Sequence, residues 1–591
     1  MATYIGLWCR LLRLPFAVTG GERHIARGRR RLLSSTGTAA ATAETEHLGG
    51  EAVVAAAAEK LCTSADSEVS SRKKTFSEVQ AERKEQAKRM VLINCPVKMS
   101  EKKFLQYLSL HGKIENHFFY ESFGTFAVVE FSNGDSIASL QDATSIQRFR
   151  DEYPIPFKTR HFTLTLKKLS RQPDDQRLLH HHKQSTIPTS DLLQKLCRAN
   201  NVSDQLNMVM DECQLTEENT KLRFLTCSLI QDIVGAYFPD STVKPFGSSV
   251  NSFGRLGCDL DIFLDLDETK GDNTRRKTGH INMEYQMKRA SSERIATQKI
   301  LSVVSECIDN FGPGCVGVQK ILNARVPLVK FSHQPSGFQC DLTANNRIAI
   351  RSSELLYIYG NLDSRVRALV FGVRCWDRER KITSRIPGPW ITNFSLTMMV
   401  LFFLQKRNPP IIPTLGQLKN LAGAGDNHII DGHDCTFVSD LNKIKPTENT
   451  ETLDVLLNDF LEYFGNFDFS KNSINLRTGK MQNKPESSPL FIQNPFEQTL
   501  NISKNVDQTQ VKRFVTLARD SAWILQQGEK GPSSHSSQPW GMAAILLAAT
   551  TNDGGKSKTA ARVQKSARIK NLLDSLTFNL NTQKRTFGTQ A

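Results

Sequence analysis

The stretch Phe246-Gly-Ser-Ser249, followed by Asp259-Leu-Asp261, largely decides the fold of this chain. The first stretch predicts a tight turn with hydroxyl groups, and the second predicts a strand with two carboxylates. Residues i and i+2 of a strand point to the same face, so Asp259 and Asp261 are expected to project together. Two aligned carboxylates repel each other unless a cation lies between them. Oxygen ligands of this kind suit Mg²⁺ or Mn²⁺ together with the phosphates of a substrate.

The neighbouring residues support a strand with one buried face. Cys258, Leu260, Ile262 and Leu264 alternate with Asp259, Asp261, Phe263 and Asp265. The first set can face a core while the aspartates face a cleft. Gly247 permits backbone N–H groups to approach a phosphate closely, and Ser248 or Ser249 adds a hydroxyl donor. The alternative is an acidic strand end that simply faces solvent.

Gly247-Ser248 and Asp259-x-Asp261 resemble the signature of the polymerase-β-like nucleotidyltransferase superfamily. That signature implies a third carboxylate on a later strand. Residues 325–331 are predicted to form a strand, and Phe338–Leu342 are predicted to form another that carries Asp341. Within the superfamily, residues 186–506 resemble the non-canonical poly(A) and poly(U) polymerases. The resemblance implies two-metal nucleotidyl transfer with release of pyrophosphate.

The resemblance also implies residues that contact the nucleotide. Arg374 and Arg378 lie one helical turn apart, where the family carries two lysines that meet the triphosphate. Their alternative interpretation is a solvated basic helix face. Asn393 and Phe394 correspond to a serine–tyrosine pair at the nucleotide, and Phe394 would stack on the base. Ser352 stands where many relatives place an asparagine that contacts the sugar.

The expected base is adenine. Residues 453–469 resemble the poly(A)-polymerase-associated domain, and residues 492–501 resemble its nucleotide-recognition loop, which includes Asn501. Relatives that prefer UTP often carry a histidine just before this asparagine, whereas this chain has Leu500. An imidazole would crowd a purine, and leucine leaves room for adenine. The substrates predicted are therefore ATP and RNA 3′ ends.

Charge is concentrated at the two ends of the chain. Residues 1–40 contain seven arginines and one acidic residue, which gives +6, and residues 531–591 contain eight Lys or Arg and two Asp, also +6. Of the total of +16, 16 − 6 − 6 leaves +4 for the residues between. An Arg-rich, acid-poor start with an apolar helical face is typical of a mitochondrial transit peptide, which predicts the matrix. Apolar runs are far shorter than the ~20 residues of a membrane span, so no membrane insertion is expected.

Residues 71–170 have the strand and helix order of an RNA-recognition motif. Strands are predicted at 91–96 and 124–131, with helices at 102–111 and 136–149. Such sheets stack bases on aromatic side chains. Here Leu92 and Val128 replace two of the usual aromatic residues, and Phe126 remains. A face of this kind favours protein contact, so we expect homodimerisation through this domain, with weak RNA binding as the alternative.

The predicted fold class is α+β and multidomain: a polymerase-β-like palm, a mostly helical central and associated domain, and an N-terminal domain like an RNA-recognition motif. The predicted segments are a transit peptide (1–40), a disordered linker (41–70), the N-terminal domain (71–170), a linker (171–188), a helical part of the central domain (189–225), the palm (226–350), the central and poly(A)-polymerase-associated domain (351–530) and a basic flexible tail (531–591). The predicted function is mitochondrial RNA 3′-end adenylyl transfer. Its rivals are uridylyl transfer, a catalytically idle scaffold and transfer to a small molecule.

Overall fold

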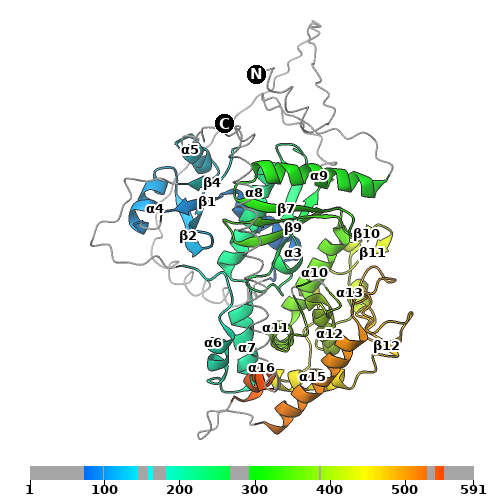
Figure 1. The fold of residues 1–591 in the computed structure, drawn as a ribbon. Coiled ribbons are helices and arrows are strands. Elements are labelled where there is room, and N and C mark those ends of the chain that lie inside the picture. Colours follow the sequence, from blue (N-terminus) through cyan, green and yellow to red (C-terminus); the bar gives the residue numbers. More distant parts are fainter. Residues whose placement is uncertain are drawn as a thin grey trace, which may run out of the picture. The chain divides into compact units, whose positions relative to one another are not determined.

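The computed structural model describes residues 72–96, 99–143, 158–163, 181–266, 292–384, 386, 388–528 and 539–551. The predicted transit peptide (1–40) and linker (41–70) lie outside these ranges. Helices and strands are mixed along the chain (Figure 1), as the predicted class requires. Within the described ranges, no helix is long and apolar enough to cross a membrane.

The described chain begins with a helix and a small sheet. Helix α3 starts at a capping box, in which Thr75 and Glu78 satisfy each other's backbone N–H groups. The strands of the sheet lie in the order β2-β3-β1-β4. The elements in chain order are α3 (Phe76–Lys88), β1 (Met90–Cys95), α4 (Glu101–Ser109), β2 (Ile114–Glu121), β3 (Thr125–Phe131), α5 (Asp135–Ala143) and β4 (His161–Thr163).

The last strand of this sheet departs from the predicted topology. β1 and β3 are antiparallel, with Leu92 opposite Val128. A strand-helix-strand crossover of the usual kind would bring β4 parallel to β3. Instead β4 runs parallel to β1, with Phe162 opposite Ile93, and therefore runs opposite to β3. The predicted order of elements is present, but the direction of β4 is not that of such a crossover.

One face of this sheet is covered by the same chain. Leu92 and Val128 are at most 1% exposed, and they share a hydrophobic core with helix α8 (Glu217–Val234) and the second sheet. The Tyr120 hydroxyl donates a hydrogen bond to the backbone carbonyl of Pro335 at 2.8 Å. The face contacts protein, as its composition predicts, but that protein is the palm. It is not available to stack RNA bases or to bind a second copy.

The second sheet, in the palm, carries the predicted carboxylates. Its order is β5-β6-β9-β8-β7, and only the β6–β9 pair is parallel. Helices α8 and α9 pack against this sheet (Figure 1). Leu260, Ile262 and Leu264 are fully buried in the shared core, as predicted. Cys258 is half-buried and precedes the strand, and Phe263 and Asp265, predicted to face a cleft, are buried as well. The elements are β5 (Thr242–Pro245), β6 (Leu260–Asp265), α9 (Glu293–Phe311), β7 (Cys315–Ile321), β8 (Leu328–His333) and β9 (Phe338–Ala344).

A mostly helical unit contains the other large core. Helix α12 is buried from Ser395 to Gln405, at the centre of this core. The helices are α6 (Thr189–Leu196), α7 (Val202–Cys213), α10 (Arg347–Leu362), α11 (Ser364–Glu379), α12 (Asn393–Gln405), α13 (Leu415–Asn420), α14 (Leu453–Gly465), α15 (Gln508–Gln527) and α16 (Gly541–Thr551). Short elements connect them: η2 (Ala424–Asp426), β10 (Ile429–Ile430), β11 (His433–Asp434), η3 (Leu441–Lys443), β12 (Asn472–Ser473) and β13 (Gln482–Asn483).

Three boundaries differ from the sequence prediction. Leu222 and Leu225, predicted to lie in the central domain, belong to the core shared by the palm and the N-terminal sheet, because α8 is a single helix. Helix α10 begins at Arg347, whereas the predicted helical pattern begins at Ser353. Part of the predicted flexible tail is ordered: α16 packs into the helical core, and Met542 is fully buried there. The rest of that tail lies outside the described residues.

Candidate active site

The predicted carboxylates meet at one end of the palm sheet. Asp261 in β6 lies directly opposite Asp341 in β9, because these parallel strands are in register. Asp259 precedes the strand, which begins at Leu260. Asp259 is exposed, whereas Asp261 and Asp341 are half-buried. The register of the sheet therefore brings together residues that are far apart in the sequence.

The three carboxylates interact through their charges. Burial raises the pKa of Asp261 to about 7, and the neighbouring charges of Asp341 and Asp259 add to the rise. Arg223 and Lys330 act in the opposite direction on the same pKa. A cation at this end of the sheet would favour the charged form of Asp261 and lower its pKa.

Lys330 is a cation that sequence reasoning did not assign to the site. It lies opposite Asp341 in the β8–β9 ladder, and its Nζ atom is 2.8 Å from Oδ1 and 3.1 Å from Oδ2 of Asp341. Burial alone would lower the pKa of Lys330, but the hydrogen bond and charge of Asp341 raise it. The predicted strand 325–331 included Lys330, but pairing between strands is needed to identify its partner.

The carboxylates fit a divalent metal ion by their chemistry. Three oxygen-donating groups with mutual repulsion are what Mg²⁺ or Mn²⁺ would neutralise. They are not a closed cage, since no group of three or more His, Cys, Asp or Glu side chains in the described ranges is arranged to hold a metal. The carboxylate of Asp341 instead forms an ion pair with Lys330. Metal binding by Asp341 would require it to share or leave this ion pair.

The predicted turn is a short 3₁₀ helix, η1 (Gly247–Ser249), held against β6. Gly247 has φ +62°, and a Cβ atom there would lie 2.6 Å from Oδ2 of Asp261. The backbone N–H of Phe246 donates to the carbonyl of Asp261 at 3.0 Å. That of Gly247 donates to the hydroxyl of Ser353 at 2.8 Å. Glycine is therefore required both by the backbone conformation and by the approach of Asp261.

The two hydroxyls of the turn are already engaged within the chain. The Ser248 hydroxyl donates to Sγ of Cys258 at 3.3 Å. Ser249 is 4% exposed, and its hydroxyl accepts a hydrogen bond from Arg223 at 2.9 Å. Ser249 therefore supports the turn from inside, and its predicted contact with phosphate stays a prediction. Ser352 donates to the carbonyl of Ile348 in its own helix.

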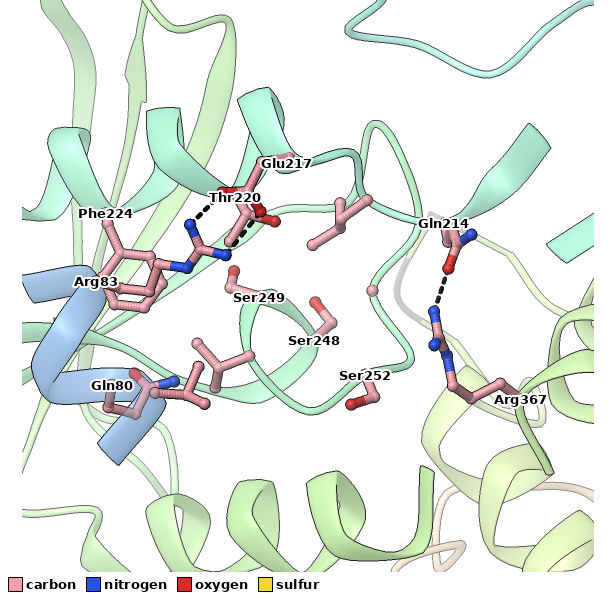
Figure 2. Close-up of a pocket in the computed structure, with 14 residues that line it drawn as sticks. Gln80, Arg83, Gln214, Glu217, Thr220, Phe224, Ser248, Ser249, Ser252 and Arg367 are labelled. Atoms are coloured by element: carbon pink, nitrogen blue, oxygen red, sulfur yellow. Dashed lines mark hydrogen bonds and ion pairs between the residues drawn. The ribbon is translucent and has the colours of Figure 1, made fainter. Parts of the chain in front are cut away.

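A pocket lies beside the turn, and none of the three aspartates lines it. Figure 2 shows Ser248, Ser249 and Ser252 on the loop that borders it. On another side Arg83 of α3 forms a paired contact with Glu217 of α8, with Nη2 and Oε2 2.7 Å apart. The N-terminal helix α3 therefore reaches the neighbourhood of the turn at Gly247–Ser249. This proximity has no counterpart in the sequence pattern.

The predicted arginines lie beside a third one. Arg374 donates to the carbonyl of Phe253 at 2.7 Å and to Oδ1 of Asn393 at 3.3 Å. Burial lowers the pKa of Arg374 to about 10, and the cations of Arg255 and Arg378 contribute. Arg378 also contacts a neighbouring acid, Glu379, at 3.1 Å. Guanidinium groups that repel one another in this way suit a polyanion such as a triphosphate.

The predicted base-binding residues occupy the start of α12 and a nearby loop. Asn393 and half-buried Phe394 open the helix, and Ser395 contacts the hydroxyl of Ser503 at 2.9 Å. Leu500 and Asn501 lie on the loop that this contact connects to the helix. This brings two predicted stretches, distant in sequence, into one region.

The side chain of Asn501 is engaged within its own loop. It is 4% exposed, and its side-chain Oδ1 accepts from the backbone N–H groups of Ile492 and Ser503. Its Nδ2 donates to the carbonyl of Leu490 at 2.9 Å. Its amide therefore holds the loop that carries Leu500, and its predicted contact with the nucleotide stays a prediction.

The chain matches three family models: "Poly(A) RNA polymerase, mitochondrial-like, central palm domain" over residues 202–361, the RL domain over 75–145, and "Cid1 family poly A polymerase" over 452–503. It is 57% identical to the Mus musculus mitochondrial poly(A) RNA polymerase over 98% of this chain and 99% of that protein. The Homo sapiens counterpart is 60% identical over 88% and 90%. A crystal structure of mtPAP in complex with ATPγS matches with a TM-score of 0.75 and 62% identity, over 80% of this chain and 99% of that one. The chain therefore belongs to the family of mitochondrial poly(A) RNA polymerases.

Proposed function

We propose that Asp259, Asp261 and Asp341 form the catalytic centre of this polynucleotide adenylyltransferase. ATP is its substrate, and the 3′-hydroxyl of RNA is the acceptor. The observation that carries the proposal is the register of β6 and β9, which sets Asp261 beside Asp341. In the reaction, the 3′-oxygen bonds to the α-phosphorus of ATP, the bond to pyrophosphate breaks, and the hydroxyl proton is lost.

The three carboxylates would hold Mg²⁺ or Mn²⁺, which when bound would neutralise phosphate charge and lower the pKa of the attacking hydroxyl. The chain's own residues supply position and charge around that point. Gly247 keeps the turn close to Asp261 without a side chain between them. Ser248 remains the hydroxyl of the turn proposed to contact a phosphate oxygen, because it is half-buried and its bond to a thiol is weak.

The nucleotide is proposed to bind between the arginines and the start of α12. Arg374 and Arg378 would neutralise the triphosphate, with Arg255 adding a third charge. Asn393 shares a hydrogen bond with Arg374, so phosphate and base contacts would be linked. Phe394 would stack on the base. Leu500 is proposed to favour adenine by leaving room for a purine.

We further propose a mitochondrial matrix location and homodimerisation through the N-terminal domain. The matrix follows from the Arg-rich composition of residues 1–40. Since one sheet face contacts the palm, a dimer would use another surface of the domain. Leu110 and Phe123 are 79% and 74% exposed there. Sedimentation of Phe123→Asp and Leu110→Asp variants tests this: a shift to monomer is expected, and an unchanged dimer would contradict it.

The catalytic assignment is tested with the purified full chain, an RNA primer, Mg²⁺ or Mn²⁺, and each nucleotide separately. The wild type should extend the primer with ATP, and Asp259→Ala and Asp341→Ala should lose extension while keeping the thermal midpoint of the wild type. If both variants still extend the primer, the catalytic residues must lie elsewhere in the chain. Preferred extension with UTP would identify a uridylyltransferase, and no extension with any nucleotide would leave an idle scaffold.

A further inference from the structure

Helix α8 carries a fully buried arginine whose role the sequence does not reveal. Arg223 is 0% exposed and lies between Leu222 and Phe224, which are also buried. Removing a guanidinium from water is costly unless its donors find partners. The helical pattern of residues 192–234 offers no hint of this, since an arginine in an amphipathic helix is more often solvated.

The partners of Arg223 all lie close to the catalytic centre. Nη1 donates to the Ser249 hydroxyl at 2.9 Å and to the carbonyl of Asp259 at 3.0 Å. Nη2 donates to the carbonyl of Cys258 at 2.8 Å. Nε donates to Oδ1 of Asn219, one turn earlier in α8, at 2.8 Å. None of these four hydrogen bonds is to a carboxylate side chain, so the guanidinium of Arg223 forms no ion pair through them.

The same guanidinium also contacts the strand that carries Asp341. Its carbon lies 4.6 Å from the ring centroid of Phe338, the first residue of β9. One planar group thus touches the turn, the backbone that leads into β6, and the start of β9. These three segments contain Gly247, Asp259 and Asp341.

We propose that Arg223 is a positioning residue that fixes the spacing of these three segments and thereby prepares the carboxylates to receive the metal ions. The inference rests on the proposed function of the aspartates. The carbonyl of Asp259 is held directly, so the direction of its side chain depends on the fork of Arg223. Lysine cannot reproduce a planar fork with bonds to several acceptors, so lysine should restore the fold better than it restores metal binding.

A second buried arginine, which precedes β4 and packs on the same helix, gives a control. Arg160 is 7% exposed, and its Nη2 and Nε atoms bind the Ser228 carbonyl at 2.9 Å and Asp232 at 2.8 Å. These partners lie toward the C-terminal end of α8, and Arg160 connects that end to the N-terminal domain. Arg160→Met therefore removes a buried cation that contacts α8 from the N-terminal domain, without touching the turn at Gly247–Ser249.

The experiment compares Arg223→Met, Arg223→Lys and Arg160→Met in the full chain. Binding of Mn²⁺ is measured by the electron paramagnetic resonance of the free ion, with a non-hydrolysable ATP analogue present. Adenylation rates are measured at saturating ATP and corrected for the folded fraction. We expect Arg223→Met to weaken Mn²⁺ binding and lower kcat by about 10- to 100-fold, as is usual when a group that orients metal ligands is removed. KM for ATP should change little, and Arg223→Lys should be intermediate.

Arg160→Met should lower the thermal midpoint but keep the Mn²⁺ affinity and kcat of the wild type. If folded Arg223→Met keeps both values, the proposal is overturned. If that variant does not fold, Arg223→Lys and Asn219→Ala, which frees Nε, replace it. Wild-type Mn²⁺ affinity in both would overturn the proposal equally. An active Asp261→Asn enzyme would instead refute the assignment of the aspartates, so the two failures are distinguishable.

Discussion

The two main sheets of the molecule differ in what one of their faces contacts. In the N-terminal sheet, Leu92 and Val128 stand in mid-strand on a face that is buried against the palm. In the palm sheet, Asp261, Asp341 and Lys330 lie side by side on three neighbouring strands, opposite the helix-covered face. The apolar face is covered by protein, whereas these three charged side chains stay partly exposed. The comparison teaches that a few residues decide whether a sheet face packs against protein or stays charged and accessible.

The largest stability effect is expected at the covered face. Tyr120→Ala removes a fully buried ring that stacks on Phe126 at a centroid distance of 5.8 Å. We expect a loss of about 3–5 kcal/mol in the free energy of unfolding, measured by urea denaturation. Tyr120→Phe removes only the hydrogen bond to the carbonyl of Pro335, so it should lower the free energy of unfolding by about 1 kcal/mol. Phe123→Ala at the exposed hairpin should cost almost nothing. Equal, small losses for all three would mean that the face is not buried.

A smaller effect is expected from crowding the charged face. Gly247→Ala puts a methyl group 2.6 Å from Oδ2 of Asp261, and it strains a backbone at φ +62°. Gly257→Ala gives a control, because Gly257 has φ +79° and nothing within 4 Å of an added Cβ. Both variants should lose about 1 kcal/mol of stability from backbone strain. Only Gly247→Ala should also lose adenylation rate, by about 100-fold, since small misplacements of reacting groups cost that much.

The free energy of unfolding should depend on pH by about 2 kcal/mol through Asp261, which lies on the charged face of the palm sheet. Asp261 has a folded pKa near 7, above its usual value of 3.8, so the native state holds its proton longer than the unfolded chain. Its contribution to stability is full below pH 4 and is lost as the pH rises to about 7. His161 and His333, buried with pKa values lowered to about 4 and about 3, act in the opposite direction below pH 6.5. Asp377, raised to about 7 as well, adds to the loss.

The difference between the wild type and Asp261→Asn isolates the one carboxylate. In metal-free buffer, the variant should gain stability relative to the wild type between pH 5 and pH 8, by about 2 kcal/mol after allowing for partial exposure. Thermal midpoints at each pH measure this difference. Mg²⁺ should narrow it, because an ion stabilises the charged form. A difference that does not change with pH would contradict the raised pKa.

The smallest effect is expected at Leu500. Leu500→His should raise the use of UTP relative to ATP by about 3- to 10-fold, since one added hydrogen-bonding group beside a base has a modest effect on selection. Initial rates with each nucleotide give the ratio. Asn501→Ala serves as a structural comparison: it should destabilise the loop and lower both rates together. An unchanged ratio in Leu500→His would remove Leu500 from base selection.

Sequence reasoning succeeded where chemistry is local. The alternation around Asp261 predicted a strand with one buried face, and a resemblance supplied Asp341 on a second strand. Register then set the two side by side, which sequence spacing alone does not determine. The apolar face of Leu92 was correctly expected to contact protein. Its partner could not be predicted, because α8 follows about a hundred residues later.

Some contacts of the site could not be predicted from the sequence. Ser249 and Asn501 were predicted only as ligand-binding residues, and their polar atoms also form hydrogen bonds within the chain. Arg223 and Lys330 were missed for the converse reason, since a cation on a helix or strand is usually solvated. Whether a polar atom turns inward or outward depends on contacts that only the folded chain supplies. The tail was predicted to be flexible, because the sequence does not show that α16 packs against α7, α11 and α15.

The core shared by the N-terminal sheet and the palm has a consequence for how the protein is made. Synthesis produces β1 to β3 before α8, so the ribosome releases a sheet whose face, with Met90 and Phe118, has no cover until α8 emerges. That face is an aggregation hazard during this interval, and a chaperone that shields it would raise yield. The same logic warns against cutting the chain between the sheet and α8. Each fragment would expose apolar surface that the other was built to cover.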